Sequence, residues 1–79
     1  MPQQLQSQSL KQEALKAYAD AKTAQKFDMN FKEAYKYYEQ AKQYLKILKK
    51  TVTGAELQDI EQLLAKIKSK QEKCKLQAS

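Results

Sequence analysis

The apolar positions of the chain recur with the period of an α-helix in three separate segments. They are spaced three or four residues apart, which places them along one face of a helix. The three apolar stripes are Leu10, Ala14, Ala17, Ala21 and Ala24; Phe31, Ala34, Tyr38, Ala41, Leu45, Leu48 and Val52; and Leu57, Ile60, Leu64, Ile67 and Cys74. No segment of useful length alternates with a period of two. The pattern predicts three helices, over residues 9–27, 31–51 and 54–76.

The breaks between the stripes carry residues that begin and end helices. Three pairs have the spacing of a capping box, in which the first side chain caps the helix N-terminus. They are Ser9 with Gln12 (Ser7 being a competing start), Asn30 with Glu33, and Thr53 with Glu56. The only glycine, Gly54, weakens the helix at the second break.

Short connections between helices of similar length make sequential helices antiparallel neighbours. The expected fold is therefore all-α, an antiparallel up-down-up three-helix bundle over residues 9–76. The Gln/Ser-rich residues 1–8 are expected to form a disordered leader or a stub of a larger protein, and residues 77–79 a tail.

The composition argues against most catalytic chemistry. The 79 residues include no histidine, one cysteine and one glycine. An internal disulfide needs a second cysteine, and a zinc site without histidine lacks its usual ligands. A single glycine does not make a phosphate-cradling loop, and acid–base catalysis near neutral pH relies most often on histidine. We expect no enzyme, no cofactor and no metal, with Cys74 as a packing residue or inert thiol.

All fifteen basic residues are lysine, and the formal net charge is +6. Lysine is a hydrated point charge without the bidentate fork of arginine, so it suits loose attraction to acidic partners better than sequence-specific nucleic-acid binding. Residues 32–50 hold six lysines and two glutamates, and residues 66–79 five lysines and one glutamate. Residues 51–65 hold three acids and no lysine. No apolar run approaches the roughly 18–20 residues of a membrane span.

Two tyrosines and two lysines lie at the edges of the predicted core faces. Tyr37 and Tyr44 are seven residues apart and nearly superimposed along the second helix, while Leu63 with Lys66 and Lys70 occupies the matching edge of the third. If these edges face one another, they form an apolar trough with tyrosine walls and a lysine rim, which an acidic amphipathic helix would fill. The alternative is that the tyrosines widen the core face and the lysines are a solvated surface.

Other apolar residues lie off the main stripes. Leu15, Tyr18 and Ala19 could line a second groove, between the first and third helices, although single exposed apolar residues are ordinary. Tyr35, on the far edge of the second helix, is expected to cover the core.

The runs Ala17-Tyr18-Ala19-Asp20-Ala21 and Phe31-Lys-Glu-Ala-Tyr-Lys-Tyr-Tyr-Glu-Gln-Ala41 resemble the microtubule-interacting and trafficking (MIT) domain. That family has a small-residue first helix, an aromatic-x-Glu-Ala entry to the second, and a Lys-rich third helix. The resemblance covers about residues 10–76, and tetratricopeptide helix pairs share part of the pattern. Two features depart from the family pattern. The turn over residues 26–30 is about one residue longer than usual and lacks the common glycine. Residues 70–74, Lys-Gln-Glu-Lys-Cys, replace the frequent Arg-Ala-Glu.

The MIT resemblance implies a non-catalytic adaptor that binds acidic terminal helices of ESCRT-III-type membrane-remodelling proteins. It implies a monomeric, cytoplasmic domain that is recruited to endosomal membranes through its partner. Carried over by position, the peptide-binding groove between the second and third helices would comprise Tyr37, Tyr44, Leu48, Leu63, Lys66, Ile67 and Lys70. A second resemblance, through Ala21-Lys22, the run from Ala34 to Lys42, and Gly54, is to the basic helical repeat of coiled-coil-and-C2-domain (Lethal giant discs) proteins, which bind the same polymers.

Two further functional classes remain open at this point. The lysine blocks could bind nucleic acid or an anionic membrane nonspecifically. The chain could also be a structural linker that self-associates through the trough.

Overall fold

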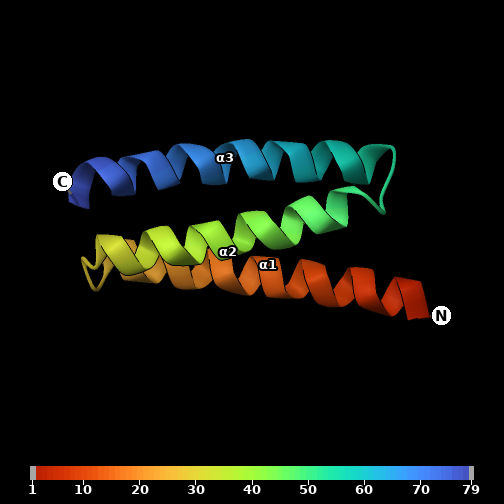
Figure 1. The fold of residues 1–79 in the computed structure, drawn as a ribbon, viewed down its shortest axis with the longest axis horizontal. Coiled ribbons are helices and arrows are strands. Elements are labelled where there is room, and N and C mark those ends of the chain that lie inside the picture. The colour runs from red at the N-terminus through yellow and green to blue at the C-terminus, as the bar shows by residue number, and fades with distance from the viewer. Residues whose placement is uncertain (1, 79) are drawn as a thin grey trace.

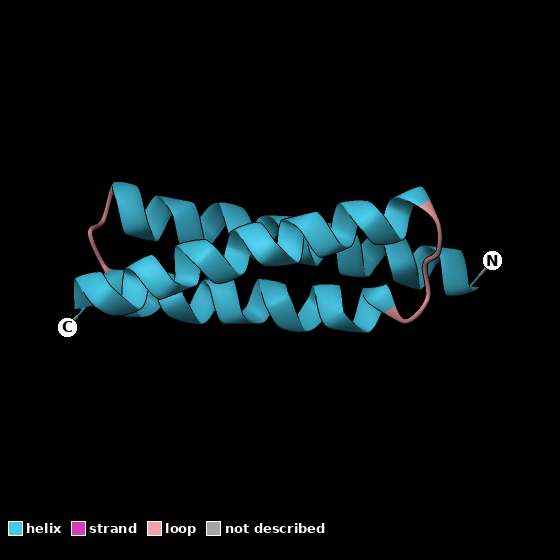
Figure 2. Ribbon diagram, turned by 90° about the horizontal axis from the view of Figure 1, so that it is seen from above, coloured by secondary structure: helices cyan, strands magenta, loops and turns pink. Residues whose placement is uncertain are grey.

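The computed structural model describes the backbone of residues 2–78 and the side chains of residues 9–78. It contains the three helices α1 (Pro2–Lys26), α2 (Phe31–Lys49) and α3 (Ala55–Ala78). Helices α1 and α3 run in the same direction and α2 runs between them in the opposite one (Figure 1). In the perpendicular view α3 crosses the other two helices at an angle (Figure 2), and its packing contacts are mainly with α2. The predicted all-α, up-down-up three-helix bundle is confirmed, and residues 2–78 contain no strand.

Most helix ends differ from the predicted ones, by a single residue at the end of α1 and at the start of α3, and by more at the other points. Helix α1 begins at Pro2 in place of the disordered leader predicted for residues 1–8, of which Met1 lies outside the described residues. Proline is favoured at the first helical position, and the glutamine and leucine that follow are good helix formers. Helix α2 ends two residues early, at Lys49. Helix α3 includes residues 77 and 78 of the predicted tail, while residue 79 is not described.

The caps explain where α2 and α3 begin. The Asn30 side chain accepts a hydrogen bond from the Glu33 backbone N–H at 3.3 Å and donates one to the Glu33 carboxylate at 2.9 Å, which confirms that capping pair. Ser9 instead lies within α1, and α3 starts at Ala55 directly after Gly54. Gly54 has φ +67°, a left-handed conformation in which a side chain would be strained.

The core combines a thin layer of alanine with larger side chains. The alanines of the first stripe from Ala14 onward are buried in α1 and pack on α2, where Ala34 and Ala41 are also buried. Alanine on both sides lets the two backbones approach closely. Larger side chains fill the rest of the core, the most buried being Tyr38, Leu45, Leu48, Ile67 and Cys74. Cys74 is a packing residue as expected, and burial raises the pKa of its thiol, so the unreactive protonated form is favoured.

The close approach of α1 and α2 predicts that a larger side chain in the alanine layer is destabilising. Ala21→Leu places a leucine at a fully buried position and should lower the free energy of unfolding by about 1–3 kcal/mol. Ala19→Leu, two residues away and exposed, is the matched control and should change it by less than about 0.5 kcal/mol. Urea unfolding followed by circular dichroism measures both. Equal effects of the two substitutions would contradict the close packing.

Candidate functional site

The residues of the predicted tyrosine–lysine trough lie at two different helix interfaces. Leu48 and Ile67 are buried in the core, with 2% and 0% of their surface exposed. Tyr37 lines a hollow together with residues of α1, and Tyr44 lies seven residues further along the same edge of α2. Lys70 instead lies on the side of α3 that is turned toward α1, close enough to Lys22 and Lys26 to feel their charge. Leu48 and Ile67 are therefore core residues, and Tyr37 and Lys70 lie toward α1.

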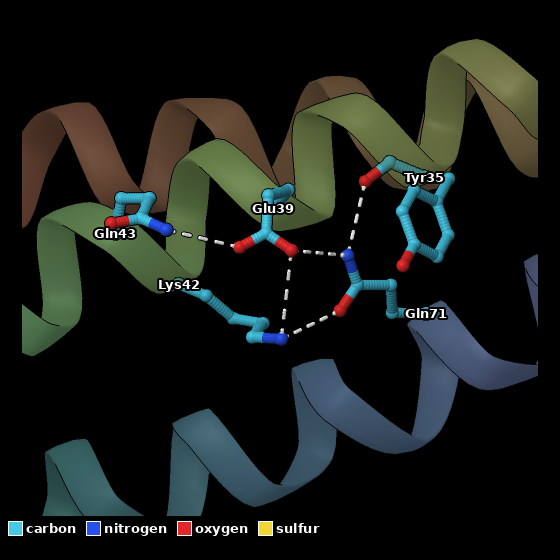
Figure 3. A network of polar contacts seen from close by, with 5 residues as sticks. All are labelled: Tyr35, Glu39, Lys42, Gln43 and Gln71. Atoms are coloured by element: carbon cyan, nitrogen blue, oxygen red, sulfur yellow. Dashed lines mark hydrogen bonds and ion pairs between the residues drawn. The ribbon is translucent and has the colours of Figure 1, made fainter.

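The opposite edge of α2 faces α3, and polar contacts centred on Gln71 hold the two helices together (Figure 3). Lys42 Nζ donates to Gln71 Oε1 at 2.8 Å, while Gln71 Nε2 donates to Glu39 Oε1 at 3.0 Å and to the Tyr35 backbone oxygen at 3.4 Å. Glu39 also accepts a hydrogen bond from Gln43 and lies 3.7 Å from Lys42. We call Gln71, Glu39, Lys42, Gln43 and the Tyr35 carbonyl the Gln71 network.

The Gln71 network satisfies a polar side chain in an apolar position. Gln71 is only 4% exposed, and no buried side-chain nitrogen or oxygen of residues 9–78 lacks a hydrogen-bond partner. The hydrogen bond from Gln71 and then that from Gln43 lower the pKa of the Glu39 carboxyl, so the ionised form is stabilised. A buried amide with specific partners fixes the rotation of a helix more strictly than an apolar residue does. The α2/α3 interface is thus closed by specific contacts.

The edge of α2 that faces α1 is acidic. The Tyr37 hydroxyl donates to Glu33 Oε1 at 3.2 Å, and a hollow of about 220 Å³ beside it is lined by Asp20, Thr23, Ala24 and Asp28 as well as these two residues. The hydrogen bond to Glu33 is the main cause that raises the pKa of Tyr37, with the charges of Glu33, Asp20 and Asp28 adding to it. Negative charge here repels an acidic helix, so this tyrosine edge does not suit the predicted partner.

The side of the bundle shared by α1 and α3 is basic, although these two helices hardly contact one another and each packs mainly on α2. We call this side the basic seam and define it by Lys22, Lys26, Lys66, Lys70 and Lys73. Partial burial is the main cause that lowers the pKa of Lys70, and the charges of the four other lysines lower it further. Within the described residues, no carboxylate lies within ion-pair distance of any of the five. The seam therefore concentrates positive charge that no carboxylate of residues 9–78 pairs with at close range.

Aromatic and apolar side chains lie beside the basic seam. Lys22 Nζ stands 4.5 Å from the centre of the half-buried Tyr18 ring, a cation–π contact. That ring packs at 6.0 Å on Tyr38, whose hydroxyl donates to Gln25 at 2.8 Å, and burial raises the pKa of Tyr38 to about 12. Leu63, half-buried, lies on the same edge of α3 as Lys66 and Lys70. Leu15 of α1 is 44% exposed. The site combines lysines that have no carboxylate partner among the described residues with half-buried aromatic and apolar side chains.

The sequence pattern missed Gln71 and the α1 lysines of the seam. A signal for Gln71 was present: it lies seven residues after Leu64 and four after Ile67, at a position where the third stripe requires an apolar residue. No group of histidine, cysteine or acidic residues within the described part of the chain is placed to hold a metal ion. None of its helices has an apolar stretch that could cross a bilayer.

The hydrogen bond between Gln71 and Glu39 predicts the effect of exchanging the amide and the carboxylate of these two residues. Gln71→Glu sets a carboxylate against that of Glu39 and should lower the free energy of unfolding by about 1–3 kcal/mol. Adding Glu39→Gln restores a carboxylate–amide pair of reversed direction and should recover most of the loss. Gln62→Glu, at an exposed position of α3, is the control. Urea unfolding measures all four proteins. Failure of Glu39→Gln to rescue would contradict the pairing.

Comparison with known proteins adds no identification. No protein-family model, curated protein or solved structure matches the chain. The helical bundle and the contacts within it are therefore the basis for any functional conclusion.

Proposed function

We propose that the chain is a non-enzymatic protein-interaction module whose basic seam binds an acidic, amphipathic segment of a partner. The observation that carries this proposal is Lys70, a half-buried lysine whose charged neighbours are four other lysines. Crowding like charges at a partly buried position is unfavourable in the free protein. A partner that supplies carboxylates relieves the repulsion between these lysines, and this relief contributes favourably to the free energy of binding.

The apolar side chains beside the lysines indicate that the partner segment is amphipathic. Tyr18 and Leu63 are half-buried beside the lysines, so each leaves apolar surface that a partner side chain can cover. A segment with leucine-like residues on one face and carboxylates beside them fits both features. Lysine, without the bidentate geometry of arginine, gives attraction with little geometric selectivity. A single short segment buries little area, so we expect a dissociation constant in the micromolar range.

The MIT resemblance supplies the partner class for this proposal, the acidic terminal segments of ESCRT-III-type membrane-remodelling proteins. The proposed docking position, however, differs from the one that the resemblance implies. The geometry favours the side of the bundle shared by α1 and α3, which combines Leu15 and Tyr18 of the alternative groove with Leu63, Lys66 and Lys70 of the predicted site. It does not support the α2/α3 interface, where the Gln71 network fills the contact. In this role the domain brings an attached or associated protein to endosomal membranes.

Amide chemical shifts of the ¹⁵N-labelled chain, titrated with acidic amphipathic peptides from such termini, test the proposal. The shifts should concentrate on α1 residues 15–26 and α3 residues 63–73. Lys66→Glu should weaken binding by about tenfold, and Leu63→Ser should also weaken it. Lys36→Glu, an exposed position of α2, makes the same charge change and should alter affinity by less than about twofold.

Two results would contradict the proposal. Shifts centred on Tyr37 and Tyr44 would place the site at the acidic α1/α2 edge. Binding that falls steeply with salt but is indifferent to Leu63→Ser would indicate a nonspecific polyanion site.

A further inference from the structure

Three of the most exposed apolar side chains of the molecule lie at one end of the bundle. Phe27 is 81% exposed and Met29 is 63% exposed, both in the turn between α1 and α2, and Leu76 in the last turn of α3 is 77% exposed. The α1–α2 turn and the C-terminus of α3 lie at the same end (Figure 1). Gln25 Nε2 donates to Gln77 Oε1 at 3.2 Å, which ties the two segments together. We call Phe27, Met29 and Leu76 the apolar tip.

The turn that carries Phe27 and Met29 is held by hydrogen bonds. The backbone N–H groups of Phe27 and Asp28 both donate to the Thr23 carbonyl, at 2.9 and 3.2 Å, and that of Asn30 donates to the Ala24 carbonyl at 2.9 Å. The bond from Asn30 to Ala24 joins residues that are six apart in the sequence. In the Schellman motif, which commonly ends a helix at glycine, the corresponding 6→1 bond joins residues one position closer. The side chains of Phe27 and Met29 are therefore held in solvent by an ordered turn.

Met29 occupies a backbone conformation that favours glycine. Its φ is +53°, and it is the one non-glycine residue with positive φ in the described backbone. A side chain in this region is strained relative to glycine. An exposed methionine here adds no packing to offset that strain, so its presence is better explained by a contact outside the molecule than by stability.

The charge around the apolar tip is mainly positive. Lys26, Lys32 and Lys73 are exposed close to it in the sequence and in the fold, and residues 66–78 as a whole hold five lysines and one glutamate. Asp28 and Glu33 also lie at this end, but they line the hollow on the α1/α2 side. Exposed aromatic and aliphatic side chains surrounded by lysine are the combination that anionic lipid surfaces bind, through apolar insertion and headgroup attraction together.

We infer that the apolar tip docks on an anionic lipid bilayer, with Phe27, Met29 and Leu76 entering the interfacial region and lysines contacting the headgroups. This goes beyond the peptide-binding role, because the apolar tip lies at the end of the bundle and shares only Lys26 and Lys73 with the basic seam. It orients the bundle with its long axis away from the membrane and leaves the middle of the basic seam open to a partner.

Because the chain contains no tryptophan, a single tryptophan can report insertion. The Phe27→Trp chain is mixed with phosphatidylcholine vesicles with and without about 30% phosphatidylserine, at about 0.1 M salt. Its emission should shift to the blue with the anionic vesicles only. Ile47→Trp, in α2 away from the apolar tip and 50% exposed, is the matched control and should show no shift. An unshifted Phe27→Trp, or equal shifts of both variants, would overturn the inference.

Co-sedimentation with the same vesicles tests the energetic contribution. Phe27→Ser should weaken binding by about tenfold, and Met29→Gly by about threefold. Both should leave the helical circular dichroism unchanged, and Met29→Gly should not lower the free energy of unfolding, since it removes backbone strain. Vesicle binding that is unaffected by Phe27→Ser would show that lysines alone attach the chain. A dimer in solution that Phe27→Ser abolishes would assign the apolar tip to a second copy instead. Either result would overturn the inference.

Discussion

The buried amide of Gln71 determines which surfaces of this bundle are closed and which are open. It bonds to Glu39, Lys42 and the Tyr35 carbonyl, all on one edge of α2. Because that edge of α2 contacts α3, the other edge of α2, which bears Tyr37 and Tyr44, faces α1. The remaining edge of α3, with Leu63, Lys66 and Lys70, then also faces α1. One polar contact thus sets the rotation of the third helix and the position of the basic seam.

The same arrangement separates the charges of the molecule. Acids collect on the α1/α2 side around Tyr37, and lysines collect on the side shared by α1 and α3, where the described part of the chain places no carboxylate within ion-pair distance. If these acids and lysines formed ion pairs within the chain, the lysines would repel one another less. They would then also attract an acidic partner less strongly. The basic seam and the apolar tip adjoin at the end where α1 and α3 terminate. Peptide binding along the seam and lipid contact at the tip are therefore compatible in one orientation of the domain.

The fold could be predicted from the sequence because its apolar stripes are regular. Spacings of three and four residues locate the core face of each helix, and the Asn30 cap places the start of α2 correctly. The groove could not be predicted in the same way. A stripe shows which face of a helix is buried, but the two edges of that face are nearly equivalent, and α3 can pack on either side of an α1–α2 hairpin. The choice depends on the contacts that Gln71 makes with Glu39 and Lys42, which require three-dimensional positions.

The most direct test of this account is the position of residue 70 relative to the other two helices. A nitroxide label is attached at Lys70→Cys in a Cys74→Ala background, and paramagnetic broadening of the ¹⁵N-labelled amides is measured. Our account predicts the strongest interhelical broadening on α1, around Lys22 and Lys26. Strongest broadening on α2 around Tyr37 and Tyr44 would place Lys70 in the α2/α3 groove and would contradict the account.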